Sequence, residues 1–254
     1  MKTLEDLTTP FGHIKICESP DDGSRTYIQD EYSHSRADKN GTSLVAYIHA
    51  MQATLLQAGA SRILTLGCAG GTLATMLTRA GCDVTMIDIN PHAFDLARRY
   101  FALPPEVECV LADARHYLET TREQFDGIAI DVFDNGEIPL HLRTVDFFQL
   151  VYSRLAKNGV IVINAIMSHD LDLLPDNVAA SVREATGLPV TILDEPDESD
   201  RNIIITAGYV SPVNLPVGNE SASLQKELKK LSPRAIRWQA SAYYNETLIK
   251  AEAH

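Results

Sequence analysis

The sequence predicts an α/β fold: a doubly wound, mostly parallel sheet of seven strands, preceded by a small N-terminal β-hairpin. From about Ser61 onward, short apolar runs rich in β-branched residues alternate with segments of helical length and spacing. This alternation is typical of a parallel sheet flanked by helices. Of the 254 residues, 45% are hydrophobic and 22% are charged, so the chain can bury a core, and neither a disordered nor a fibrous protein fits.

The main predicted domain covers residues 42–211. Its strands are expected in seven apolar runs: Arg62–Leu66, Asp83–Asp88, Glu108–Leu111, Gly127–Asp131, Val160–Asn164, Val190–Leu193 and Asn202–Ala207. Its helices are expected at Ser43–Gln57 before the first strand and then at Thr72–Arg79, Pro91–Tyr100, Arg115–Thr121, Leu142–Leu155 and Asn177–Thr186. Pro91 suits a first helical turn, where no N–H donor is needed.

The N-terminal region, residues 1–41, has a different sequence pattern. Ile14–Cys17 and Thr26–Gln29 have the composition of short strands, and the turn-rich segment Ser-Pro-Asp-Asp-Gly-Ser separates them. We therefore expect a β-hairpin here.

The C-terminal region, residues 212–254, begins with two prolines that break regular structure. The charged segments Ser221–Leu231 and Ala235–Ala251 then follow helical spacing. They predict a helical tail.

The composition excludes several classes of function. With 22 Lys and Arg against 34 Asp and Glu, the formal charge is −12 and the pI is about 5.0. This disfavours nucleic-acid binding, which depends on cationic side chains, and suits a cationic small molecule. No apolar run is long enough for a bilayer and the first residues lack a signal peptide, so no membrane contact and a cytoplasmic location are expected. The four cysteines form no CxxC pair and the eight histidines lack ligand spacing, so no metal is expected.

A glycine-rich turn joins the first expected strand to a helix: Gly67, Cys68, Ala69, Gly70, Gly71 and Thr72. Glycines let a ligand approach the backbone, and the free N–H groups of a helix start favour acceptor atoms. The dinucleotide pattern G-x-G-x-x-G is not met, because Ala69 and Thr72 hold its second and third glycine positions. Asp88, followed by Ile89, ends the next strand 21 residues after Gly67. A carboxylate there can bind both ribose hydroxyls, so the pattern predicts a nucleoside site.

The third expected strand ends in Asp113 and Ala114. In an open α/β sheet, ligands lie above the carboxyl ends of the strands, so Asp113 can face the amino group of an adenine. The residue is also suited to cap the helix that follows. Both roles can hold at once.

The fourth expected strand ends in two carboxylates three residues apart, Asp131 and Asp134. At this point the chain resembles the spermidine synthase family, a branch of the class I S-adenosylmethionine-dependent transferase fold. Asp131 and Asp134 match the family's D-x-x-D, Asp88 its ribose acid, and Asp113-Ala114 its adenine-side motif. The segment Phe11–Glu18 is similar to the family's opening strand.

The chain departs from the family at three places. The first-turn acid that holds the aminopropyl amine in the family corresponds to Gly70. His34 replaces a glutamine after the N-terminal hairpin, and Tyr47-Ile-His49 stands where the family has Tyr followed by His or Gln and then Glu. His34, Tyr47 and His49 are therefore candidates for contacts to the substrate.

The resemblance implies a transferase that moves an aminopropyl group from decarboxylated S-adenosylmethionine to a small cationic amine, in a possible homodimer. A sulfonium leaves as a neutral thioether, so the site must align and deprotonate an amine; Asp131 and Asp134 suit orientation and base roles. Methyl transfer from S-adenosylmethionine and a catalytically silent nucleoside-binding protein remain as alternatives. Gly70 favours methyl transfer, whereas the aspartate pair and the N-terminal hairpin favour aminopropyl transfer.

Overall fold

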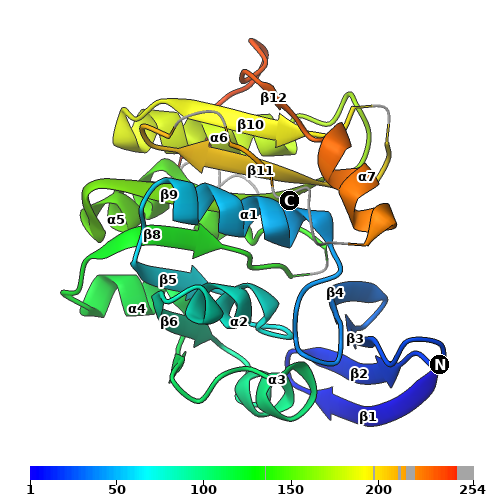
Figure 1. Ribbon diagram of the computed structural model, residues 1–254. Coiled ribbons are helices and arrows are strands. Elements are labelled where there is room, and N and C mark those ends of the chain that lie inside the picture. The colour runs from blue at the N-terminus through cyan, green and yellow to red at the C-terminus, as the bar shows by residue number, and fades with distance from the viewer. Residues whose placement is uncertain (135, 197, 211–212, 216–220, 245–254) are drawn as a thin grey trace.

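The chain folds into two sheets and their covering helices (Figure 1). A computed structural model describes the chain except for residues 135, 197, 211–212, 216–220 and 245–254. The main sheet has the strand order β12-β10-β11-β9-β8-β5-β6-β7, and a separate N-terminal sheet has the order β1-β2-β3-β4. In the part of the chain that the structure describes, no helix is both long and apolar enough to cross a bilayer.

The seven predicted strands are all present in the main sheet. They are β5 (Arg62–Leu66), β6 (Asp83–Asp88), β7 (Glu108–Leu111), β8 (Phe125–Ile130), β9 (Leu155–Met167), β10 (Val190–Asp194) and β11 (Arg201–Ala207), and the tail adds β12 (Ser232–Arg234). Strands β5 to β9 pair in parallel, and β10, β11 and β12 add antiparallel pairs. Because β5 pairs with β6 on one side and β8 on the other, the strand order reverses at β5, and ligands bind at such a reversal.

The helices cover both faces of this sheet. They are α1 (Ala46–Gln57), α2 (Thr72–Arg79), α3 (Ala93–Phe101), α4 (Ala114–Thr120), α5 (Val145–Ser153), α6 (Leu174–Thr186) and α7 (Ala222–Lys230), with a 3-10 turn η1 (Leu140–Leu142). Helices α4, α5 and α6 pack on one face and α1 and α2 on the other. Alternate residues of a strand point to opposite faces, so Leu64 and Leu66 join the first core cluster while Ile63 joins the second.

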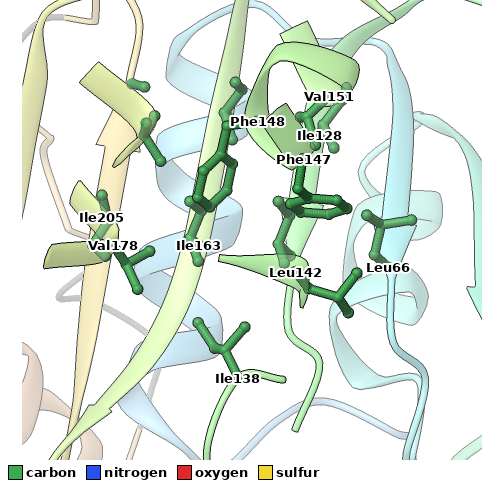
Figure 2. Close-up of a cluster of buried hydrophobic side chains, with 14 of the residues drawn as sticks. Leu66, Ile128, Ile138, Leu142, Phe147, Phe148, Val151, Ile163, Val178 and Ile205 are labelled. Carbon is green, nitrogen blue, oxygen red and sulfur yellow. The ribbon is translucent and has the colours of Figure 1, made fainter. Parts of the chain in front are cut away.

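The first core cluster centres on two rings of α5 (Figure 2). Phe147 and Phe148 are fully buried, and their ring centroids lie 5.4 Å apart at 63°. The helix is shorter than predicted because Thr144 caps its start, with Oγ1 accepting a hydrogen bond from the N–H of Phe147 at 3.4 Å, and Leu155 begins β9. This packing fixes the segment that follows β8.

The predicted N-terminal hairpin is part of a four-stranded antiparallel sheet: β1 (Lys2–Thr9), β2 (Gly12–Glu18), β3 (Arg25–Gln29) and β4 (Tyr32–Ala37). The outer strands β1 and β4 lack apolar runs, so the sequence did not predict them. The sheet docks on α3, because Ile14, Ile16 and Tyr27 pack against that helix and Arg25 Nη1 donates to the carbonyl oxygen of Tyr100 at 2.9 Å.

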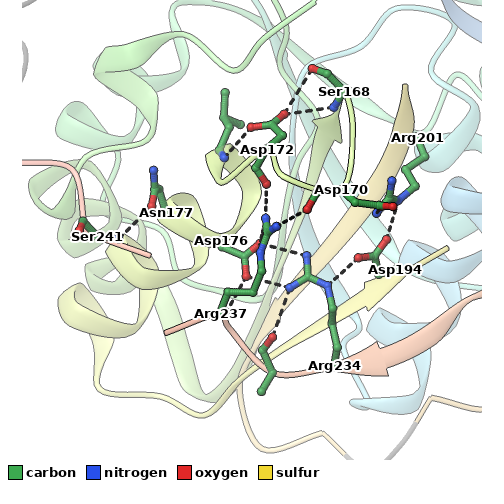
Figure 3. Close-up of polar contacts among 12 residues, drawn as sticks. Ser168, Asp170, Asp172, Asp176, Asn177, Asp194, Arg201, Arg234, Arg237 and Ser241 are labelled. Carbon is green, nitrogen blue, oxygen red and sulfur yellow. Dashed lines mark hydrogen bonds and ion pairs between the residues drawn. The ribbon is translucent and has the colours of Figure 1, made fainter. Parts of the chain in front are cut away.

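The tail departs from its prediction. Helix α7 confirms the first predicted tail helix, but the second, Ala235–Ala251, is wrong where the chain is described: residues 235–244 contain no helix, and 245–251 lie outside the described residues. Arg237 of this segment and Arg234 just before it bind buried carboxylates instead (Figure 3). Arg234 pairs with Asp176 at 2.8 Å and with Asp194 at 2.6 Å, and Arg237 also pairs with Asp176. These ion pairs hold the tail extended along the sheet edge.

Candidate functional site

A cleft of about 740 Å³ lies at the carboxyl ends of β5, β6, β7 and β8, where the strand order reverses. One wall comes from the N-terminal sheet and includes Tyr27, Asp30 and His34. The other comes from the segments that follow the four strands. A cleft of this size suits a ligand as large as a nucleoside.

The glycine turn forms part of the cleft floor. Gly67 has φ +96°, and a Cβ there would lie 2.1 Å from the carbonyl oxygen of Asp131. Only glycine allows this approach, which brings the ends of β5 and β8 together. Gly67, Cys68 and Ala69 line the cleft. Gly71 and Thr72, at the start of α2, line a smaller cavity beneath the turn instead.

Gly70 is covered by the N-terminal sheet. Its N–H donates to Ser35 Oγ at 3.1 Å. A Cβ at this position would lie 2.9 Å from Ser35 Cβ and 3.0 Å from Phe101 Cδ1. Packing therefore excludes an acidic side chain here, so the departure from the resembling family has a structural cause.

Asp88 is held rigidly beside the turn. Its Oδ2 accepts a hydrogen bond from the N–H of Cys68 at 2.9 Å, and its Oδ1 accepts one from the N–H of Asn90 at 2.7 Å. Burial raises the pKa of Asp88, and these backbone bonds oppose that shift. Ile89 is half exposed and lines the cleft with Asp88. The carboxylate lies where the sequence placed the acid for a ribose.

Asp113 caps a helix and also lines the cleft. Its Oδ1 caps α4 by accepting a hydrogen bond from the N–H of His116 at 2.9 Å. It also lines the cleft together with Ala114. Its Oδ2 lies 3.9 Å from Nε2 of His141, a residue of η1 that also lines the cleft.

Asp131 accepts hydrogen bonds from two side chains, one on β9 and one on α1. Its Oδ1 accepts a hydrogen bond from Asn164 Nδ2 at 2.8 Å, and Tyr47 donates its hydroxyl to Oδ2 at 3.4 Å. Burial raises the pKa of Asp131 to about 6, and these two bonds limit the shift. Burial and the neighbouring Asp131 raise the pKa of Tyr47, so this phenol stays protonated. A carboxylate with such a pKa can take a proton near neutral pH.

Asp134 lies three residues further, on the segment that leads to η1. Its backbone pairs with Glu137 through two hydrogen bonds of 2.9 and 3.1 Å. The residue is exposed and lines the same cleft as Asp131. The structure therefore brings the two carboxylates of the D-x-x-D pattern to one site.

Of the three residues predicted to contact substrate, His34 lines the cleft, whereas Tyr47 and His49 do not. His34 lines the cleft with its ring edge-on to Tyr27 at 6.4 Å, and burial lowers its pKa. Tyr47 reaches the site through Asp131. His49 is wrong as a substrate contact, because its side chain is buried, its Nε2 lies 2.8 Å from the carbonyl oxygen of Ser43, and it does not line the cleft.

The cleft is strongly acidic. The side chains that line it include five carboxylates, and no lysine or arginine lines it among the described residues. The carboxylates are Asp30, Asp88, Asp113, Asp131 and Asp134. This distribution of negative charge favours a cationic ligand.

Asn164, which holds Asp131, was not predicted as a site residue. The available signal was a polar residue at the end of the apolar run Val160–Asn164.

Comparisons with known proteins show which proteins the chain is similar to. A methyltransferase domain family matches residues 63–159. The probable polyamine aminopropyl transferase of Bifidobacterium longum is 27% identical over 209 residues, which are 80% of this chain and 44% of that protein. The polyamine aminopropyltransferase of Chromobacterium violaceum is 35% identical over 127 residues, which are 48% of this chain and 49% of that protein. The chain thus spans less than half the length of either relative.

Among solved structures, a probable spermidine synthase from Corynebacterium glutamicum has a TM-score of 0.78 at 20% identity, and the match covers 95% of both chains. At this identity the likeness shows the fold, which is that of the class I methyltransferases. Within that fold, the chain is similar to proteins named polyamine aminopropyltransferase and spermidine synthase, as the resemblance of its strand-end acids predicted.

Proposed function

We propose that the chain is a transferase that moves an aminopropyl group from decarboxylated S-adenosylmethionine to a small amine. The observation that carries this proposal is the carboxylate of Asp131, which Asn164 and Tyr47 hold on the wall of a cleft lined by five carboxylates. The names of the two aminopropyltransferase relatives support it. A cytoplasmic location and a homodimer stay predictions.

The residues present fit the nucleoside part of such a donor. Asp88 is fixed by two backbone N–H groups and offers its remaining lone pairs to ribose hydroxyls. Asp113 offers Oδ2 to the amino group of an adenine. Since no lysine or arginine among the described residues lines the cleft, the carboxylate of intact S-adenosylmethionine would lack a cationic partner, so the decarboxylated donor is favoured.

The donor supplies a carbon made electrophilic by the adjacent sulfonium. The acceptor amine enters as an ammonium, and Asp131 takes its proton so that the nitrogen lone pair can attack. The new N–C bond forms as the C–S bond breaks, and the sulfur keeps that electron pair. Asp134 binds the other cationic end of a diamine and orients it.

Methyl transfer from S-adenosylmethionine is the second candidate. Two observations favour it: the methyltransferase domain match over residues 63–159 and the absence of a side chain at Gly70. The acidic cleft argues against it, because among the described residues no lysine or arginine lines it to pair with the donor's carboxylate.

Two variants separate binding from catalysis. Asp88→Ala is expected to weaken the binding of either donor by about a hundredfold, because two charge-assisted bonds to the ribose are lost. Isothermal titration measures this, with Asp83→Ala at the opposite, exposed end of β6 as control. Asp131→Asn is expected to bind donor normally and to lose turnover with a diamine. Full turnover in Asp131→Asn would refute the base assignment.

A further inference from the structure

One part of the cleft has little regular structure of its own. Residues 139–142, here called the η1 wall, line the cleft from the segment between β8 and α5. The turn closes on itself through two backbone bonds, from the N–H of Leu142 to Pro139 at 2.9 Å and from the N–H of Arg143 to Leu140 at 3.2 Å. Leu142 anchors it in the core. So short a turn does not hold itself in place, so other elements must fix it.

Helix α4 supplies one of these contacts. Nη1 of Arg115 donates to the carbonyl oxygen of His141, in the middle of the η1 wall, at 3.2 Å. Nη2 of the same arginine binds the carboxylate of Asp146, in the first turn of α5, at 2.8 Å. Arg115 therefore ties the η1 wall and the start of α5 to α4.

The last described part of the tail, residues 241–243, lies on α6. The N–H of Ser241 donates to Oδ1 of Asn177 at 2.8 Å (Figure 3), and the N–H of Tyr243 donates to Oγ of Ser181 at 2.8 Å. Nδ2 of Asn177 also donates to the hydroxyl of Tyr243 at 3.3 Å. The ring of Tyr243 packs partly buried against the first core cluster. Helix α6 thus fixes the position of Tyr243.

Tyr243 in turn contacts the residues that follow the η1 wall. Its carbonyl oxygen accepts a hydrogen bond from the N–H of Val145 at 2.8 Å, one of the donors that a helix start leaves without a partner inside the helix. The guanidinium of Arg143 lies 5.2 Å from the centroid of its ring, where a cation is attracted to the ring face. Nη1 of Arg143 also donates to Oε2 of Glu137 at 3.2 Å. Arg143 therefore joins the two ends of the η1 wall and lies against the tail.

We propose that Tyr243 is a positioning residue for the cleft. Its ring and its carbonyl oxygen hold Arg143 and the start of α5, and thereby keep the η1 wall where a ligand requires it. The inference rests on the proposed function only for the ligand, a nucleoside. When the wall leaves this place, the binding-competent fraction of the protein falls, and the apparent dissociation constant rises by the inverse of that fraction. Because such coupling is reciprocal, a bound nucleoside also stabilises the tail on α6.

Tyr243→Ala tests this role in the full chain, because it removes the ring and keeps the main-chain carbonyl. Hydrogen exchange, followed by mass spectrometry, is expected to become faster in peptides that contain the η1 wall. Titration with 5′-methylthioadenosine is expected to show about tenfold weaker binding, since the attraction between cation and ring is lost. In a turnover assay the KM for the donor is expected to rise while kcat stays unchanged, because the carboxylates of the cleft remain in place.

Three further variants separate positioning from a general loss of structure. Tyr243→Phe keeps the ring and is expected to keep the wild-type affinity. Trp238→Ala changes an aromatic residue of the same tail that is 88% exposed, and it is expected to change neither exchange nor affinity. Arg143→Met is expected to reproduce the effect of Tyr243→Ala, and the double variant is expected to lose no more than either single variant, because both remove one contact.

Wild-type exchange of the η1 wall in both Tyr243→Ala and Arg143→Met overturns the proposal, and so does faster exchange with unchanged affinity for the nucleoside. If Tyr243→Ala fails to fold, the wild-type protein decides: methylthioadenosine is expected to slow exchange at the amides of Ser241 and Tyr243, and unchanged exchange there refutes the coupling. If the wild-type protein does not bind the nucleoside, the proposed function fails, and exchange of the η1 wall in the variants still decides whether Tyr243 holds it.

Discussion

Replacing Asp131 with asparagine is expected to stabilise the protein at neutral pH while it removes turnover. Burial raises the pKa of Asp131 from 3.8 to about 6, and one pKa unit corresponds to about 1.4 kcal/mol. Above pH 6 the charged carboxylate therefore lowers the free energy of unfolding by about 3 kcal/mol relative to a neutral side chain. Asparagine retains the shape and can still accept a hydrogen bond from Asn164.

The difference in stability between the wild-type protein and the variant depends on pH. A carboxyl group whose pKa is raised by folding stabilises the protein fully below its unfolded pKa, and this contribution disappears as the pH rises through the folded pKa. The two proteins are therefore expected to be equally stable near pH 3.8. The advantage of the variant grows as the pH rises from 3.8 to about 6, and it is complete above that pH.

Urea denaturation of both proteins between pH 4 and pH 8 measures this difference. Asp83→Asn, an exposed aspartate at the start of β6, is the control and is expected to stay within about 0.5 kcal/mol of the wild-type protein at each pH. A difference for Asp131→Asn that does not depend on pH, or that has the opposite sign, would refute the reasoning.

Three further changes test other parts of the site and fold. Asn164→Ala removes a bond that favours the charged form of Asp131, so the acid limb of the pH–rate profile is expected to rise by about one pH unit; an unmoved limb contradicts this. Gly70→Asp is expected to lower the free energy of unfolding by about 1–3 kcal/mol, because its Cβ would meet Ser35 at 2.9 Å; thermal unfolding measures it, and a stable variant speaks against the packing argument. Asp176→Ala leaves Arg234 and Arg237 without this buried partner and is expected to lower the free energy of unfolding by about 3 kcal/mol, measured by urea denaturation. A decrease below about 1 kcal/mol would contradict the view that these ion pairs hold the tail.

The strand-end acids could be predicted from the sequence because the physical rule behind them is local. Asp88, Asp113 and Asp131 each follow a short apolar run and precede a turn or a helix. The carboxyl ends of parallel strands share one edge, so the order of elements alone places these acids together. The structure brings all three to one cleft.

The remaining features depend on contacts between distant segments. The strands β1 and β4 carry no apolar run, so their pairing depends on β2 and β3. The spacing of Ala235–Ala251 suited a helix, but Arg234 and Arg237 bind buried carboxylates, and such tertiary contacts override helix propensity. The contact between Arg143 and Tyr243 depends in the same way on the path of the tail, and neither residue has a sequence context that predicts it.

The identity of the nucleoside product tests aminopropyl transfer most directly. The purified protein is incubated with decarboxylated S-adenosylmethionine and a panel of diamines, and in parallel with S-adenosylmethionine, and the products are identified by mass spectrometry. The proposed function predicts 5′-methylthioadenosine and a diamine heavier by one aminopropyl group, both absent with Asp131→Asn. S-adenosylhomocysteine as the product, or donor binding without any product, would contradict it.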